Sequence, residues 1–297
     1  MLVLRDLGRA GEHPSALVYI VGGKLRELRE DADLSPKQVR AAVGILPAKL
    51  SKIETGKSRC SLTDARALLD LYRVHDPVHV AQFLEVAEHA LRPPHWKACS
   101  VPAFFAPLVS LEFAAEQLRI FEPFYVPGLL QTRAYATAVI RAEWPNRTTA
   151  EVRKVVKLRE ARQAQYQRML DSGQAPHLWV IVRSEALLHS IGDKAVLRDQ
   201  LEHLLRRLRT TPDITFQVAP ASAMGKVPIP HNLTHLRFNR AELADAVYIE
   251  QTTDAAFHTD RATVEHHLSQ LNRLAPVILT PEESVAFIEE CLDELSG

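Results

Sequence analysis

Apolar residues recur every three or four positions through the first third of the chain, in short stretches that end at glycine, proline or small polar residues. This spacing places the apolar side chains on one face of a helix. It predicts a compact all-α unit of five helices, over residues 23–32, 35–43, 47–54, 62–72 and 77–91.

Residues typical of helix ends support the second and third of these helices. Ser35 suits the capping position, Pro36 suits the first helical position, and Gln38 completes a capping box. Gly44 supplies a residue that tolerates a left-handed turn directly after Val43. The two helices are therefore predicted to be short and to be joined by a tight turn.

The pattern changes after residue 102, where helical stretches begin to alternate with short runs typical of strands. The predicted helices cover residues 131–142, 149–170, 194–209, 261–274 and 281–294. The predicted strands cover residues 118–123, 177–182, 214–219, 233–238 and 246–251. This order predicts a mixed α/β domain with a small sheet.

The chain is therefore predicted to have two domains. Residues 1–20 are expected to form a loosely ordered lead-in, and residues 21–91 the all-α domain. The segment 92–102 (RPPHWKACSVP) breaks the helical pattern and is the predicted linker. The α/β domain is expected to fill residues 103–297.

Charge and composition add limits but no function. The 297 residues contain 36 basic and 36 acidic side chains, so no global charge favours nucleic acid, although residues 23–73 carry eleven basic and seven acidic ones. The three cysteines are scattered, which is typical of a reducing compartment. With no membrane-length apolar run and no signal-peptide layout, a cytoplasmic protein is expected.

The third predicted helix has two different faces. Leu50 and Ile53 lie on the apolar face, and Lys49 and Lys52 lie on the opposite face beside Gly56. Two short helices joined by a tight turn have the layout of a helix-turn-helix, in which lysines reach guanine edges or phosphates. The alternative from spacing alone is a five-helix bundle whose lysines face only water.

A resemblance favours the first interpretation. The stretch GKLRELREDADLSPKQVRAAVGILPAKLSKIETGKSRCS resembles the DNA-binding domain of the Xre/phage-repressor family of regulators, which has the all-α lambda-repressor-like fold. The resemblance implies base contacts from Pro47, Ala48, Lys49 and Lys52, and phosphate contacts from Ser35, Lys37, Thr55 and Lys57. Gln38 and Arg59 complete the predicted DNA-binding set.

The same resemblance implies a structural ion pair between Arg29 and Glu54, which orients the recognition helix. Two positions depart from the family pattern. Pro36 stands where a glutamine is frequent, and Leu46 stands where serine or threonine usually caps the helix. Neither residue offers the side-chain contact expected there.

The resemblance extends into the second domain. VPGLLQT at residues 126–132 and LTPEESVAFIEECL near the end are similar to the C-terminal domain of actinobacterial, antitoxin-like Xre regulators. The resemblance implies a small acidic partner protein encoded nearby. Phe121, Phe124 and Tyr125 are candidates for the lining of a ligand pocket, although clustered aromatics more often belong to a core.

Enzymatic chemistry is not predicted. His231 and His235 are four residues apart, but they fall near a predicted strand and lack the convergent third ligand that a metal needs. No nucleophile elbow, P-loop or dinucleotide-binding motif is present in the sequence. No cofactor and no metal are therefore expected, and a hydrolase fused to a DNA-binding domain is the weakest interpretation.

The prediction is a sequence-specific transcriptional regulator that binds double-stranded DNA. One helix-turn-helix makes few contacts, so a homodimer on a pseudo-palindromic operator is expected. The C-terminal domain is expected to sense a small-molecule effector or a partner. The alternative is an antitoxin-like interaction module that sequesters a small partner protein and regulates its own promoter.

Overall fold

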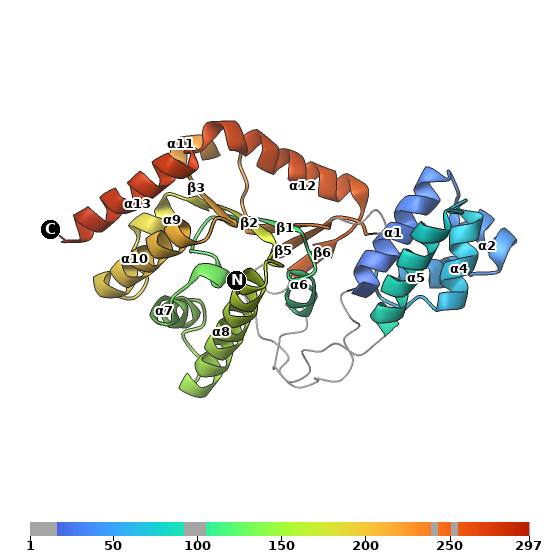
Figure 1. The fold of residues 1–297 in the computed structure, drawn as a ribbon, viewed down its shortest axis with the longest axis horizontal. Helices are drawn as coiled ribbons and strands as arrows, with labels where there is room; N and C mark the ends of the chain where they lie inside the picture. Colours follow the sequence, from blue (N-terminus) through green and yellow to red (C-terminus); the bar gives the residue numbers. More distant parts are fainter. Residues whose placement is uncertain (1–16, 92–104, 239–242, 251–254, 297) are drawn as a thin grey trace.

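The structure is a computed structural model that describes residues 17–91, 105–238, 243–250 and 255–296. Its first domain is the predicted set of five helices (Figure 1). Their bounds are α1 Leu17–Asp31, α2 Pro36–Val43, α3 Pro47–Glu54, α4 Leu62–Leu71 and α5 Pro77–Leu91. Their apolar faces share one core, in which Leu25, Leu50 and Leu68 are fully buried. The prediction of an all-α domain followed by a mixed α/β domain is confirmed.

The first helix begins earlier than predicted. Residues 17–20 were assigned to a loose lead-in, but they form the first turn of α1. Val18 and Ile20 are buried there, and this burial stabilises the turn despite the two glycines that follow it. The remainder of the predicted lead-in and the linker 92–102 lie outside the described residues.

The second domain is built on a six-stranded sheet with the order β3-β2-β1-β4-β5-β6. The strands are β1 Gln117–Glu122, β2 His177–Arg183, β3 Ile214–Ala219, β4 Leu233–Arg237, β5 Ala246–Glu250 and β6 Ala255–His258. β1, β2 and β3 are parallel to one another, whereas β4, β5 and β6 pair antiparallel. Five of the six strands match the predicted ones. β6 was not predicted, because its four residues show no alternation of apolar and polar side chains.

Helices cover both faces of this sheet (Figure 1). α7, α8, α10 and α13 lie on one face, where Leu118, Val180 and Tyr248 point into the larger core. α12 lies on the other face against Phe121 and Ile249. The helices are α6 Ala106–Leu111, α7 Arg133–Glu143, α8 Thr149–Asp171, α9 Glu185–Leu188, α10 Lys194–Thr210, α11 Ala221–Met224, α12 Arg261–Leu274 and α13 Pro281–Ser296, with short 3-10 turns at Gly128–Leu130 and Ala275–Val277.

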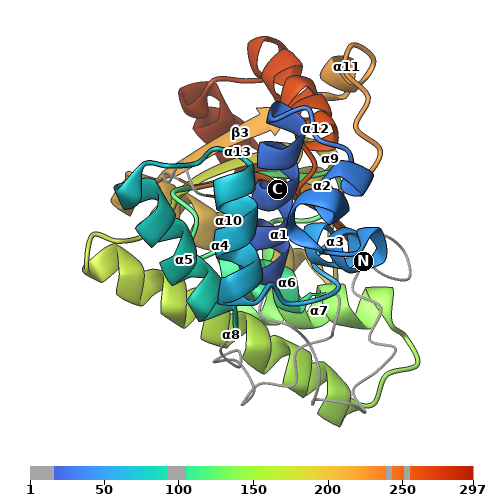
Figure 2. The same ribbon diagram turned by 90° about the vertical axis from the view of Figure 1, so that its right-hand side faces the viewer.

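Helix α1 lies between α3 and the second domain (Figure 2). A Cβ atom at Gly22 would lie 2.1 Å from the carbonyl oxygen of Ile53 in α3. A Cβ atom at Gly23 would lie 2.4 Å from the Cβ of Thr259, which follows β6. Any larger residue at either position would separate α1 from one neighbour, so the glycine pair is what lets this helix touch both.

Candidate DNA-binding surface and buried cavity

The turn between α2 and α3 has the geometry that the sequence predicts. Ser35 caps α2 through the backbone N–H of Gln38, and the Gln38 side chain accepts from the Ser35 backbone N–H. Gly44 has a φ of 74°, in the left-handed region. Leu46 precedes α3 and makes no side-chain capping bond, as its apolar side chain dictates. The pair of helices therefore depends on one strong cap and on its apolar contacts.

The buried face of α3 is attached to α1 by an ion pair. Arg29 donates from Nε to Glu54 Oε1 at 2.7 Å and from Nη2 to Glu54 Oε2 at 3.0 Å. A third donor of Arg29 bonds the carbonyl of Leu34, just before α2. The two side chains are only 9% and 7% exposed. One guanidinium group thus fixes α1, the start of α2 and the end of α3 in a single geometry.

Most of the side chains predicted to contact DNA are exposed, but several have partners within the protein. Pro47 is half-buried and Ala48 is exposed at the start of α3. Lys49 Nζ lies 2.7 Å from Asp64 Oδ2, and Thr55 donates its hydroxyl to the carbonyl of Ser51. Ser35 and Gln38 bond each other in the cap. These groups must exchange a protein contact for a DNA contact.

Four predicted cations differ from Lys49 in this respect. Among the described residues, no carboxylate pairs with Lys37, Lys52, Lys57 or Arg59, and all four side chains are exposed. They surround the exposed side of α3, from the first turn of α2 to the segment after Gly56. Such unpaired surface cations suit phosphate contacts, because binding releases counterions without breaking an internal ion pair.

An aromatic contact and two ion pairs attach the first domain to the second domain. The Tyr19 ring lies 5.2 Å from the Phe257 ring of β6, centroid to centroid. A Cβ at Gly56 would lie 2.4 Å from the Tyr19 ring, so Tyr19 also touches the turn that follows α3. Arg261 of α12 pairs with Glu27 at 2.5 Å and Asp31 at 2.9 Å. The two domains therefore meet through α1.

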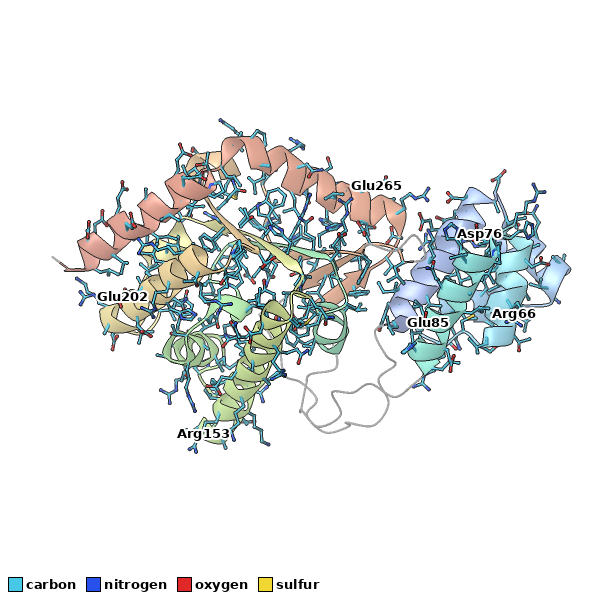
Figure 3. The ribbon with its side chains drawn as sticks, viewed as in Figure 1. Arg66, Asp76, Glu85, Arg153, Glu202 and Glu265 are labelled. Carbon is cyan, nitrogen blue, oxygen red and sulfur yellow. The ribbon has the colours of Figure 1, made fainter. Side chains whose placement is uncertain are left out.

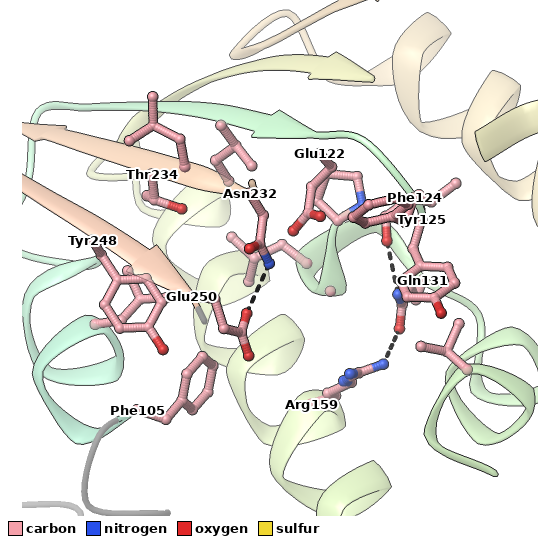
Figure 4. Close-up of a pocket in the computed structure, with 18 of the residues that line it drawn as sticks. Phe105, Glu122, Phe124, Tyr125, Gln131, Arg159, Asn232, Thr234, Tyr248 and Glu250 are labelled. Carbon is pink, nitrogen blue, oxygen red and sulfur yellow. Dashed lines mark hydrogen bonds between the residues drawn. The ribbon is translucent and has the colours of Figure 1, made fainter. Parts of the chain in front are cut away.

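A cavity of about 630 Å³ opens in the second domain at the carboxyl ends of β1 and β5 (Figure 4). Its walls come from α6, α7 and α8 and from the segment that follows β1. The sheet order reverses between β1 and β4, and open α/β sheets commonly bind ligands outside the carboxyl ends of strands at such a point. Its volume lies within the range of small-molecule sites.

The segment VPGLLQT forms one wall of the cavity, and glutamine side chains hold its backbone. Gln131 donates to the carbonyl of Val126, while Gln163 of α8 donates to the carbonyls of Gly128 and Gln131. Gln200 of α10 donates to the carbonyl of Leu130 and accepts from the N–H of Thr132. These hydrogen bonds satisfy backbone groups of a loop that has no strand or helix pairing, so they hold this wall of the cavity in one conformation.

Two arginines of α8 reach the cavity with different partners. Arg162 forms a two-bonded ion pair with Glu112, at 2.8 and 2.6 Å, and Glu112 is 1% exposed. Arg159 is 8% exposed and donates from Nη1 to the neutral amide oxygen of Gln131 at 2.5 Å. Among the described residues no carboxylate lies within ion-pair distance of Arg159. Burial lowers the pKa of its guanidinium, and the neighbouring Arg162 charge adds to the effect.

Carboxyl groups line the cavity beside these arginines. Glu122 ends β1 and Glu250 ends β5, and Glu143 comes from α7. Burial raises the pKa of Glu122 to about 8, with the Glu250 and Glu143 carboxylates adding to the shift, and burial also raises the pKa of Glu143. Glu250 accepts a hydrogen bond from the side chain of Asn232 at 3.0 Å. The cavity lining thus combines the Arg162–Glu112 ion pair with the Arg159 guanidinium and three further carboxyl groups.

The aromatic residues predicted near the pocket divide between two roles. Phe121 is fully buried in the core on the other face of the sheet and does not reach the cavity. Phe124, which is 62% exposed, and Tyr125 line it. The charged lining was not predicted. A signal existed for Arg159, because it continues the buried stripe of Val152, Val155 and Val156 on α8.

The histidines form no metal site in the described residues, where no three His, Cys, Asp or Glu side chains converge. His231 packs against His267 of α12, with ring centroids 5.7 Å apart. His235 is fully buried in β4, and its Nε2 lies 3.2 Å from Asp245 Oδ2.

Comparison with known families divides the chain at the same place as the fold. A family described as "Helix-turn-helix domain" matches residues 20–83, and one described as "Domain of unknown function (DUF5753)" matches residues 105–290. No curated protein and no solved structure gives a significant match. Within the described residues, no helix has the length and apolar character required to cross a membrane.

The Arg29–Glu54 pair gives a stability prediction. Glu54→Gln leaves the Arg29 charge buried without its partner, so we expect the free energy of unfolding to fall by roughly 3–5 kcal/mol. Urea unfolding of the full chain, followed by circular dichroism, measures the change. Glu85→Gln is the matched control, because Glu85 is exposed on α5 of the same domain and an exposed carboxylate contributes less than about 1 kcal/mol. Equal effects of the two substitutions would contradict the structural role of Glu54.

Proposed function

The chain belongs to the DUF5753 family and carries a helix-turn-helix domain, and from this premise we propose that it is a sequence-specific transcriptional regulator. The observation that carries the proposal is the exposed side of α3, held by the buried Arg29–Glu54 pair and surrounded by unpaired cations. Pro47, Ala48, Lys49 and Lys52 are the proposed base-reading residues. The proposed phosphate contacts are Ser35, Lys37, Gln38, Thr55, Lys57 and Arg59.

We propose that the regulator acts as a homodimer. One recognition helix of eight residues reaches only a few base pairs, which is too few for the specificity that a regulator needs. Two copies on a two-fold axis would read half-sites about 34 Å apart on a pseudo-palindromic operator. Sedimentation with and without a duplex of the bound sequence tests this stoichiometry.

The second domain is proposed to sense a ligand in its cavity and to pass the signal to the first domain. Tyr248 lines the cavity on β5 and is the register partner of Phe257 on β6. Phe257 contacts Tyr19, which packs against Gly56 at the end of the recognition helix. A ligand that shifts β5 would therefore change the contacts of α1, provided that it binds the two arrangements with different affinity.

The experiment that tests DNA binding is a gel shift with the purified protein and DNA from directly upstream of its coding region, across a salt series. Tight, salt-dependent and sequence-selective binding is expected. A protein that binds no sequence selectively at any salt would contradict the proposal. Where a small acidic protein is encoded nearby, repeating the titration with it separates effector sensing from the antitoxin-like alternative, in which that partner alone changes DNA binding.

Lys52→Ala tests the recognition helix. We expect DNA affinity to fall by about 1–3 kcal/mol in binding free energy, since Lys52 is exposed on α3 and would lose a base or phosphate contact. Arg153→Ala is the control, because Arg153 is exposed on α8 far from the first domain (Figure 3). An unchanged affinity for Lys52→Ala would show that another surface contacts DNA.

Lys57→Ala should instead change the salt dependence. If Lys57 neutralises one phosphate, the slope of log K against log salt concentration becomes shallower by about 0.9. The effect should be similar for specific and random duplexes, because a phosphate contact carries no sequence information. A slope equal to that of the wild type would place Lys57 outside the contact surface.

The junction between the domains gives a separate prediction. Arg261→Glu replaces two ion pairs with two repulsions against α1, so we expect DNA affinity to change by about 2- to 30-fold although Arg261 lies outside the first domain. Arg273→Glu is the matched control, with the same charge reversal at an exposed site of the same helix. If both variants changed the affinity equally, the effect would be long-range charge and the coupling through α1 would be excluded.

A further inference from the structure

The cavity of the second domain carries charges that select a class of ligand. A buried guanidinium is costly unless an anion pairs with it, and among the described residues Arg159 bonds only the neutral amide of Gln131. Arg162, one helical turn further along α8, shows the alternative, because the protein itself supplies the Glu112 carboxylate there. The cavity beside Arg159 therefore has a place for an anionic group from outside.

A ligand with only a negative charge does not suit the remaining walls. Glu122, Glu143 and Glu250 face the same cavity, and no hydrogen bond or ion pair to another described residue holds the Glu122 carboxyl. Burial has raised the pKa of Glu122 and Glu143, so a cation beside them stabilises their ionised form, whereas a further anion favours their protonated form. A metal ion is a poor candidate, since within the described part of the chain no three His, Cys, Asp or Glu side chains lie close enough together to hold one. A cation alone would leave Arg159 without a partner.

We infer that the cavity binds a zwitterionic small molecule of dipeptide size, with its carboxylate on Arg159 and its ammonium group near Glu122 and Glu250. The volume of about 630 Å³ exceeds what water or an inorganic ion needs and suits a drug-sized ligand. Tyr125 and Phe124 offer aromatic surface to the body of the ligand. Figure 4 shows Arg159 coming from α8 and the two carboxyl groups from strand ends.

The rigid loop adds specificity. Gln131 is bonded at both ends of its amide, to Arg159 and to the carbonyl of Val126, so it fixes the guanidinium before any ligand arrives. A preorganised donor loses little entropy on binding, and it discriminates against ligands that lack the matching carboxylate. A regulatory role for this ligand rests on the proposed function. Binding of the ligand to the cavity does not depend on DNA.

The test uses matched probes and calorimetry on the full chain. The probes are the dipeptides built from Phe, Tyr and Trp with free termini, together with their N-acetylated and C-amidated forms. At least one free dipeptide is expected to bind, and either block should weaken it about 10- to 150-fold, because each removes one charge-assisted interaction. No binding by any free dipeptide, or equal binding of a blocked form, would overturn the inference.

Variants then assign each end of the ligand. Arg159→Met should abolish the preference for the free carboxylate over the amide and keep the preference for the free ammonium. The double substitution Glu122→Gln and Glu250→Gln should do the reverse. Arg153→Met is the control on the exposed side of α8, and it should keep both preferences. If Arg159→Met kept the wild-type preference for the free carboxylate over the amide, the assigned role of Arg159 would be wrong.

A gel shift with the bound dipeptide separates the two proposals. If the dipeptide binds and DNA affinity changes, both stand. If it binds and DNA affinity is unchanged, the ligand class stands and the sensing role of the second domain is wrong. If no dipeptide binds while DNA binding is selective, the regulator stands and the zwitterion is excluded.

Discussion

The two adjacent glycines of α1 set the constraint on which the arrangement of this molecule depends. Gly22 lets the helix lie against the backbone of the recognition helix, and Gly23 lets the same turn lie against the segment after β6. A glycine pair inside a helix costs roughly 1 kcal/mol for each residue relative to alanine. The burial of Ile20 in the larger core and of Leu25 in the smaller one offsets that cost. The first helix is therefore a structural part of both domains.

This shared helix gives the proposed coupling between the helix-turn-helix domain and the cavity-bearing domain a physical route. A flexible tether would transmit nothing, since each domain would keep its own contacts whatever the other bound. Here Tyr19 touches both Phe257 and Gly56, and Arg261 reaches two carboxylates of α1. The recognition helix is fixed to α1 in turn by Arg29 and Glu54. A movement of β6 thus has a short physical path to the proposed DNA-binding surface of α3.

The sequence predicted the helices and strands, which depend on local patterns of residues. It did not predict the charged cavity, which depends on residues that are distant in the chain and close in the fold. The helix boundaries at Ser35 and Gly44 follow from capping and turn chemistry, and the order of helices and strands follows from hydrophobic period. Glu122 and Glu250 lie 128 positions apart in the chain, and only the pairing of both β1 and β5 with β4 brings their strand ends together. The predicted helix began at Gly23, whereas α1 begins at Leu17, because tertiary packing offsets the low helix propensity of Gly22 and Gly23.

The two arginines of α8 show how stability and function divide within one helix. Arg162 and Glu112 satisfy each other, so that pair contributes to a fixed native structure even though it is buried. Arg159 continues the same buried stripe, but no described carboxylate pairs with it, and a fold selected only for stability would have an apolar residue there. Residues that break a local rule at a cost to stability are expected at functional sites. The unpaired guanidinium is therefore the strongest structural reason to regard the cavity as a binding site, independent of the DNA-binding domain beside it.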